Sequence, residues 1–224
     1  MSEASRRKLG PHRWADFVAL EEDDLRELID GELVEVEVPG FVHERIIMRL
    51  GFFLTGWSRD HGAELLASGY KVRISDVRGV MPDLQLYREG NSPSPDQDAG
   101  LVTGCPDLVV EVVSPRSSRR YDRVVKLGYY AAKRVPEYWI VDPDARTVER
   151  LVLTGTLYAI AGQASGDEVF APASFRGLRI PLGELWAGPT EHPPTATKRR
   201  KKKTAKPARK ARALAEKKGS ARSR

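Results

Sequence analysis

Hydrophobic and polar positions along the chain predict a mixed domain of strands and helices. The strand-like segments 25–29 and 32–36 flank Asp30-Gly31, which predicts a β-hairpin closed by a type I′ turn. Between residues 42 and 59, apolar residues recur at helical spacing, so we expect a helix that packs on a core. His43 would lie in the first turn of this helix.

Further along the chain, short apolar runs predict the strands of one sheet. These runs are residues 70–74, 84–87, 108–113, 138–141, 147–153 and 156–160, and a short segment, 178–186, closes the body. A second helix is expected from about 119 to 134, after Ser and Pro residues that break the sheet. The Ser, Pro, Asp and Gly content of 88–104 predicts a loop. This order predicts a mixed α/β or α+β domain around one sheet.

Glu111 lies in the middle of the apolar run 108–113. Such a run is typical of a strand that is buried on both faces, where an unpaired ionised carboxylate carries a large free-energy cost. Two compensating arrangements are open. One is a buried ion pair with an Arg or Lys side chain, and the other is a divalent metal ion shared with a carboxylate from a neighbouring strand.

The second carboxylate has two candidates, because Pro-Asp precedes two strand-like segments and supplies Asp83 and Asp107. Asp107 lies on the same strand as Glu111, about 13 Å away at a rise of roughly 3.3 Å per residue, which is too far to share one ion. Asp83 opens a different strand, and adjacent strands run about 4.8 Å apart. Asp83 is therefore the expected partner of Glu111.

Length and composition narrow the chemistry. The 224 residues suffice for one substantial domain and a tail, with a core that needs no disulfides. One Cys and four scattered His residues give no zinc-ligand spacing, so we expect oxygen ligands. The N-terminus has no apolar signal core, and no stretch approaches the roughly 18 apolar residues of a membrane span. We expect a soluble cytoplasmic protein, with association with the nucleoid as an option.

Charge is strongly segregated along the chain. Residues 198–224 carry fourteen Lys or Arg and one Glu, a net charge of +13, so residues 1–197 carry −7 within the overall +6. The densest cationic run is Lys198, Arg199, Arg200, Lys201, Lys202 and Lys203. With little apolar content, residues 191–224 are expected to form a disordered Lys/Arg/Ala/Pro-rich tail, and residues 1–15 a flexible N-terminus.

The tail composition favours non-specific binding to nucleic-acid phosphates, with affinity that falls as salt rises. Two alternatives stay open, a solubilising extension and an arm that binds an acidic protein. Tyr129, Tyr130, Tyr138 and Trp139 lie in a predicted helix and strand, so we interpret them as packing residues and not as a platform for base stacking.

Four segments in order carry a family resemblance: LIDGELVEVEVPGFVHE, MPDLQLY, PDLVVEVVSPRSS and YDRVVKLGYYAAKRVPEYWIVDP. Together they resemble the Uma-two family of endonucleases, a branch of the PD-(D/E)xK nuclease superfamily. The resemblance implies a restriction-endonuclease-like fold over residues 16–190, with a mixed β-sheet flanked by helices. It also implies that Asp83 and Glu111 bind Mg²⁺ or Mn²⁺ for hydrolysis of phosphodiester bonds.

The superfamily pattern places a Lys two residues after the Glu, where this chain has Val113. The resemblance implies Lys126 as the replacement, in a position to orient water and stabilise negative charge. The alternative is a surface ion pair between Lys126 and Asp122. Val113 also leaves open a catalytically inactive nucleic-acid-binding or regulatory protein that keeps the nuclease fold.

Glu27 and His43 match family positions near the expected site. Glu27 could add a metal ligand or hold metal-bound water, and His43 could contact phosphate or tune a carboxylate. The alternative for Glu27 is an exposed hairpin residue, and the alternative for His43 is an ordinary polar residue at a helix start. The expected partner is nucleic acid, and DNA is favoured over RNA. Analogy with other nucleases of this fold adds a homodimer as an option.

Overall fold

The computed structural model describes residues 9–21, 24–36, 38–67, 69–91, 94–96, 101–114 and 121–188, with the backbone alone at 94–96, 101–103 and 121–123. All of these residues belong to one compact unit, Met1–Gly188. The predicted tail lies outside the described residues, as does most of the predicted flexible N-terminus, and both stay predictions. No helix in the described part of the chain is long and apolar enough to cross a membrane.

The described chain contains short and long helices and many strands. The helices are α1 (Trp14–Val18), α2 (Phe41–Asp60), the π-helix η1 (Tyr121–Lys126), α4 (Leu127–Lys133) and α5 (Leu182–Trp186). The strands are β1 (Arg26–Ile29), β2 (Glu32–Glu35), β3 (Glu64–Ala67), β4 (Val72–Ser75), β5 (Arg78–Val80), β6 (Leu84–Tyr87), β7 (Ser94–Asp96), β8 (Leu101–Thr103), β9 (Leu108–Val112), β10 (Glu137–Asp142), β11 (Thr147–Thr154), β12 (Leu157–Ser165), β13 (Val169–Phe170) and β14 (Ile180–Pro181).

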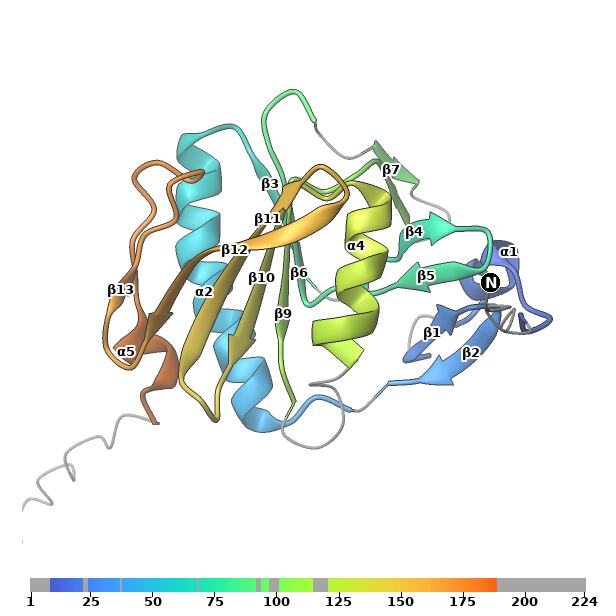
Figure 1. Ribbon diagram of the computed structural model, residues 1–224, viewed down its shortest axis with the longest axis horizontal. Coiled ribbons are helices and arrows are strands. Elements are labelled where there is room, and N and C mark those ends of the chain that lie inside the picture. Colours follow the sequence, from blue (N-terminus) through green and yellow to red (C-terminus); the bar gives the residue numbers. More distant parts are fainter. Residues whose placement is uncertain are drawn as a thin grey trace, which may run out of the picture. The chain divides into compact units, whose positions relative to one another are not determined.

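The main sheet has the strand order β12-β11-β10-β9-β6-β3 within the described residues (Figure 1). β9 and β10 run parallel, while the other neighbouring pairs in this sheet are antiparallel. Every residue of β9 and β10 is buried, as expected for central strands with both faces covered. The predicted mixed α+β fold, with a sheet flanked by helices, is confirmed. The expectation of a single sheet is wrong, because β1, β2, β4 and β5 pair with one another in a separate sheet.

Two helices cover opposite faces of this sheet, as Figure 1 shows. On one face, α2 packs its Ile46, Leu50 and Leu54 into a cluster with Val110 and Val112 of β9. On the other face, aromatic residues of α4 join a second cluster that contains other residues of β9 and β10. Because side chains alternate along a strand, β9 contributes to both clusters. Glu111 follows Val110 and so points to the α4 face.

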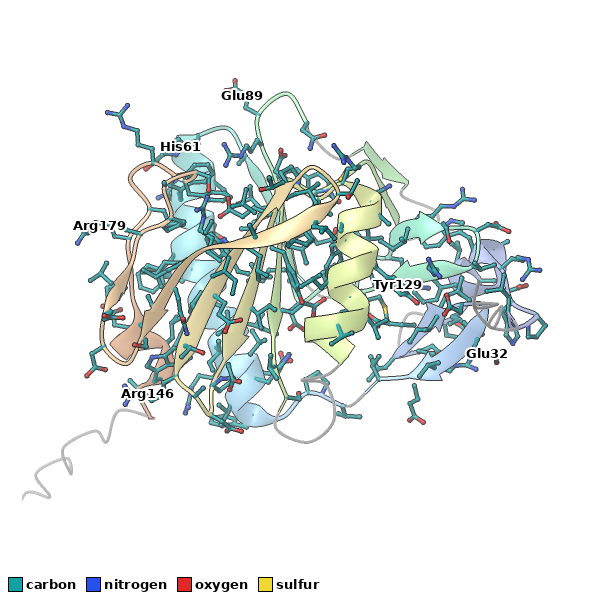
Figure 2. The ribbon with its side chains drawn as sticks, in the orientation of Figure 1. Glu32, His61, Glu89, Tyr129, Arg146 and Arg179 are labelled. Carbon is teal, nitrogen blue, oxygen red and sulfur yellow. The ribbon has the colours of Figure 1, made fainter. Side chains whose placement is uncertain are left out.

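The predicted hairpin is confirmed and forms part of a smaller sheet with the order β2-β1-β5-β4. Asp30 and Gly31 both have positive φ, 50° and 83°, as a type I′ turn requires. A Cβ at Gly31 would lie 2.5 Å from the Gly10 carbonyl oxygen, so only glycine fits there. The Arg78 guanidinium of β5 stacks 5.1 Å from the ring centre of Tyr129, which lies on the side of α4 nearer this sheet (Figure 2).

The structure corrects several predicted elements. The predicted loop 88–104 contains the two-stranded pair β7 and β8, which the Ser and Pro content concealed. The pattern also missed α1, β3, β5 and β13, because each is short and only tertiary pairing stabilises it. The predicted second helix has two parts, a π-helical turn followed by α4.

Candidate active site

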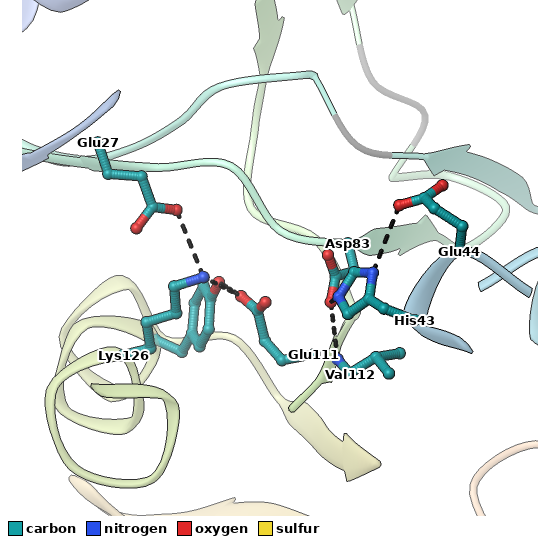
Figure 3. A network of polar contacts seen from close by, with 8 residues as sticks. Glu27, His43, Glu44, Asp83, Glu111, Val112 and Lys126 are labelled. Carbon is teal, nitrogen blue, oxygen red and sulfur yellow. Dashed lines mark hydrogen bonds and ion pairs between the residues drawn. The ribbon is translucent and has the colours of Figure 1, made fainter. Parts of the chain in front are cut away.

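Pairing of β6 with β9 brings the two predicted carboxylates together. In this antiparallel pair Leu84 faces Val110, so the register places Asp83 opposite Glu111, one position beyond the end of β6. Directly opposed side chains of an antiparallel pair lie on the same face, about 5 Å apart at Cβ. Figure 3 shows both carboxylates in one polar network. The choice of Asp83 over Asp107 therefore agrees with the sheet register.

Asp83 is held by a backbone group and by a side chain. The N–H of Val112 on β9 donates to its Oδ2 at 2.7 Å, and the Nε2 of His43 lies 3.2 Å from the same oxygen. β6 begins only at Leu84, so the Asp83 carboxylate takes the place of a strand carbonyl for Val112. These contacts fix the orientation of the carboxylate.

His43 lies in the first turn of α2 and is 8% exposed. Its Nδ1 lies 3.4 Å from Oε1 of Glu44, whose side chain is about half exposed. Burial disfavours the charged imidazolium, but the hydrogen bonds and negative charges of Asp83 and Glu44 outweigh it and raise the pKa of His43. The contact with Asp83 agrees with the predicted tuning of a carboxylate, and the role of His43 stays a prediction.

Glu111 and Glu27 share one ammonium group, although they come from different sheets. Lys126 Nζ lies 2.9 Å from Oε1 of Glu111 on β9 and 3.4 Å from Oε1 of Glu27 on β1 (Figure 3). Both carboxylates and the lysine are buried, with exposed fractions between 1% and 6%. The surface alternative for Lys126 and the exposed alternative for Glu27 are therefore both wrong.

Glu27 also holds the chain segment that leads to Asp83. Its Oε1 accepts a hydrogen bond from the backbone N–H of Met81 at 2.8 Å, two residues before Asp83. This contact links the hairpin of the smaller sheet to the start of β6. The predicted site residues thus form two adjacent groups of contacts. His43 contacts Asp83, and Lys126 contacts Glu27 and Glu111. The Val112 N–H, next to Glu111 in the chain, joins the groups by its hydrogen bond to Asp83.

Tyr130 is a member of the network that the sequence interpretation missed. Its hydroxyl donates to Oε1 of Glu111 at 2.5 Å, the same oxygen that Lys126 contacts. Burial raises the pKa of Tyr130 far above its usual value, and the nearby Glu111 charge adds to the rise, so the phenol keeps its proton. The i, i+4 spacing from Lys126 was the available signal, since such residues lie on one helix face.

The packing prediction for Tyr138 and Trp139 is confirmed, since both side chains are fully buried. Val113 is also buried, in the cluster that contains α4 residues. The position where the superfamily has its Lys is therefore part of the apolar core here. The ammonium group beside Glu111 comes from Lys126 at the end of η1 instead.

The oxygen ligands of the site suit a metal ion that needs few protein ligands. Within the described residues, no group of three or more His, Cys, Asp or Glu side chains is arranged to hold one. Two carboxylates still suit Mg²⁺, because this ion keeps several waters and commonly uses one or two protein carboxylates together with substrate phosphate. Asp83 and Glu111 are oxygen ligands on adjacent strands, which fits Mg²⁺ or Mn²⁺. The predicted nucleic-acid-binding residues, 198–203, lie outside the described residues.

Three comparisons relate the chain to known proteins. A search of curated proteins returns no significant match. A crystal structure described as a putative nuclease belonging to DUF820, from Anabaena variabilis, shares the fold. It has a TM-score of 0.65 and 17% sequence identity, with 79% of this chain and 98% of that chain covered. The model of the Uma2 family, described as "Putative restriction endonuclease", matches residues 14–183. The chain therefore belongs to the Uma2 family.

Proposed function

We propose that the protein is a metal-dependent endonuclease that hydrolyses phosphodiester bonds of nucleic acid, with DNA as the preferred substrate. One observation carries the proposal. Two carboxylates, Asp83 and Glu111, lie opposite each other at the end of a strand pair, and the ammonium group of Lys126 contacts one of them. Membership of the Uma2 family supports the same reaction class.

In this proposal Asp83 and Glu111 hold a Mg²⁺ or Mn²⁺ ion. A bound ion of this kind supplies Lewis-acid polarisation of the phosphoryl group and lowers the pKa of a coordinated water. The residues that fix these two carboxylates are His43 and the Val112 N–H at Asp83, and Tyr130 at Glu111. Holding ligands in one orientation before the ion binds reduces the entropy cost of assembling the site.

Lys126 has two roles in this proposal. Near the scissile phosphate its ammonium group would stabilise negative charge that develops in the transition state. In the protein alone it compensates Glu111 and Glu27, which are both buried. When a cation occupies the carboxylate pair, Glu27 offers Lys126 a second carboxylate partner. Glu27 therefore acts in this scheme as a support for Lys126.

The basic tail extends the proposal to substrate capture. Residues 198–224 carry +13, while residues 1–197 carry −7, so the tail supplies the attraction to phosphate that the body lacks. Deleting residues 198–224 should weaken DNA binding and reduce the slope of log affinity against log salt. Equal slopes for the full and shortened chains would contradict this role. A cytoplasmic location, with access to nucleic acid, belongs to the same proposal.

The decisive experiment is cleavage of plasmid DNA, single-stranded DNA and RNA with Mg²⁺, Mn²⁺ or a chelator. Wild type is compared with Asp83→Asn and Glu111→Gln, which keep the side-chain shapes and remove the charges. The expected result is metal-dependent cleavage by wild type alone. Cleavage by both variants at the wild-type rate would indicate a contaminating nuclease and contradict the proposal.

A second candidate function is a non-catalytic nucleic-acid-binding protein with a nuclease fold. Val113 favours it, because the superfamily pattern has a Lys at this position and here the side chain is in the core. This candidate predicts tight binding of DNA without cleavage under any metal. It also predicts that Asp83→Asn leaves the affinity for DNA unchanged in the presence of Mg²⁺.

A further inference from the structure

Helix α2 presents large apolar side chains on the face that points away from the sheet. Phe41 is 72% exposed, Met48 72% and Phe52 76%. The opposite face of the same helix carries the buried core residues Ile46, Leu50 and Leu54. A surface helix normally has polar residues on its outer face, so this exposed set marks an interaction surface.

These residues belong to a continuous stripe of exposed or partly exposed side chains along the helix. Phe41, Arg45, Met48, Phe52, Thr55 and Arg59 follow one another at alternating steps of four and three residues. We call this set the α2 stripe. Alternating steps of four and three are the spacing of residues at helix–helix contacts, where the side chains of one helix fit between those of another. The α2 stripe therefore suits a second helix as its partner.

Hollows lie on both sides of Phe52. A groove of about 900 Å³ runs between α2 and the edge strand β3, and its lining includes Met48, Phe52, Leu65 and Arg179. A second hollow of about 340 Å³ is lined by Met48, Phe52, Phe53 and residues around α5. His61 and Arg179, which Figure 2 labels, also line this groove. A surface that has a protruding phenyl ring next to a hollow can pair with a second copy of itself, because the ring of each copy can enter the hollow of the other.

Gly51 and Gly56 add to this complementarity. Both lie within α2, and a Cβ built on either would meet nothing within 4 Å. A glycine in a helix interior costs about 1 kcal/mol relative to alanine. Close approach of a second backbone is the usual compensation for that cost.

Charge distribution sets the relative direction of the two helices. The stripe begins with Phe41 beside Glu44, and it ends with Arg59. An antiparallel second copy places Arg59 of one helix near Phe41 and Glu44 of the other, at both ends of the contact at once. A parallel copy would instead set Arg45 against Arg45 and Arg59 against Arg59, which is repulsive.

We propose that the α2 stripe is a homodimer interface in which two copies of α2 pack antiparallel about a twofold axis. Phe52 of each copy enters the groove beside α2 of the other. The exposed parts of Phe41, Met48 and Phe52 amount to roughly 400 Å² if a whole side chain presents about 200 Å². A standard interface buries about 800 Å² per partner, so these three side chains supply about half of this area, and residues around the stripe, the groove walls among them, must supply the rest.

Sedimentation equilibrium of the full chain, free of nucleic acid, tests the proposal over a wide concentration range. The salt concentration is about 0.5 M, which screens contacts made by the basic tail. Wild type is expected to be a dimer. Phe52→Glu is expected to raise the dissociation constant at least about thirtyfold, and Met48→Glu about tenfold. Circular dichroism checks that each variant keeps its fold.

Ile160→Glu is the matched control. Ile160 is 70% exposed on the edge strand β12, so this variant adds the same charge to an equally exposed apolar residue elsewhere. It should dimerise like wild type. A monomeric wild type would overturn the proposal, as would a dimer that Ile160→Glu dissociates and Phe52→Glu does not. The readout needs no cleavage, so its outcome is independent of the nuclease proposal.

The relative direction of the helices has its own test. At about 0.1 M salt, where exposed charges are less screened, Arg59→Glu places a second negative charge near Glu44 of the partner and should weaken the dimer about fivefold. Adding Glu44→Arg to the same chain should recover the wild-type dissociation constant. A double variant that is weaker than Arg59→Glu alone would overturn the antiparallel arrangement.

Discussion

Two glutamates lie buried on neighbouring parallel strands, and their surroundings differ. Glu111 on β9 is 3% exposed and points to the α4 face, while Glu137 on β10 is 4% exposed. Glu137 precedes Tyr138 and alternates with it, so it points to the α2 face together with Trp139. Both glutamates have a basic side chain within hydrogen-bond distance.

Both carboxylate oxygens of Glu137 have hydrogen-bond partners from the protein, which is typical of a structural role. Arg150 contacts both of its oxygens, at 2.7 and 3.1 Å, and the indole N–H of Trp139 donates to it at 2.7 Å. The Ser174 hydroxyl is also a partner. A guanidinium that binds two oxygens in a fixed plane is suited to a structural ion pair.

Glu111 differs from Glu137 in its neighbours. Its cation is the single ammonium group of Lys126, which also contacts Glu27, and a further carboxylate, Asp83, lies opposite on β6. Several carboxylates around one ammonium group leave excess negative charge, and binding of a divalent cation would neutralise it. A buried glutamate therefore does not by itself mark a site, and the second carboxylate across the strand pair makes the difference.

The largest expected contrast is in catalysis. Glu111→Gln should lower metal-dependent cleavage at least about 10³-fold, because the variant loses a charged ligand of the ion. Glu137→Gln should cleave near the wild-type rate at a temperature where both variants are folded. Single-turnover cleavage of a labelled duplex measures both. Equal losses in the two variants would show that the contrast between the glutamates is unfounded.

The order of the two variants should be reversed for stability, where Glu137→Gln should have the larger effect. Glu137→Gln leaves the largely covered Arg150 guanidinium without its carboxylate, so the free energy of unfolding should fall by about 3 kcal/mol. Glu111→Gln should cost less, since Lys126 keeps Glu27 as a partner. Urea unfolding without added metal measures both changes. A smaller loss for Glu137→Gln than for Glu111→Gln is the contrary result.

Lys126 should affect both properties. Lys126→Met should reduce cleavage about 10²-fold through loss of a positive charge near the phosphate. It should also destabilise the metal-free protein, because Glu27 and Glu111 lose their shared cation. Added Mn²⁺ should recover part of that stability, which thermal unfolding with and without Mn²⁺ can measure. No recovery would mean that the ion does not bind beside Glu111.

The smallest expected effect is that of one hydroxyl group. Tyr130→Phe removes a hydrogen bond to the charged Glu111 and should weaken Mn²⁺ binding about tenfold. Tyr158→Phe is the matched control, because its hydroxyl donates to the Val135 carbonyl at 2.7 Å instead. Calorimetric titration with Mn²⁺ compares the two variants. Equal affinities would assign Tyr130 a purely structural role.

Much of the site could be predicted from particular residues. Glu111 was recognisable because a charge inside an apolar run needs compensation, and Asp83 because only a second strand brings a carboxylate close enough. The hairpin was recognisable from Asp30-Gly31, since few other pairs accept two positive φ angles. Each of these inferences depends on local chemistry.

Other features were beyond sequence reasoning. Tyr130 has the pattern of a core residue, and its hydrogen bond depends on where α4 lies over β9. Glu137 begins a strand much as Glu111 interrupts one, and only its contacts with Arg150 and Ser174 identify it as structural. The short strands β5, β7 and β8 form because partners lie alongside them.

The sequence alone determined the α+β class, the family resemblance, the hairpin turn and the long helix, because each depends on residue types that lie close together in the chain. It also indicated which two carboxylates pair, because that choice depends only on the spacing between strands. Tertiary structure decided which cation Glu111 receives, that Glu27 shares it, and that α2 leaves an apolar stripe exposed. Contacts between elements far apart in the chain depend on how whole elements pack, and no local pattern encodes that packing.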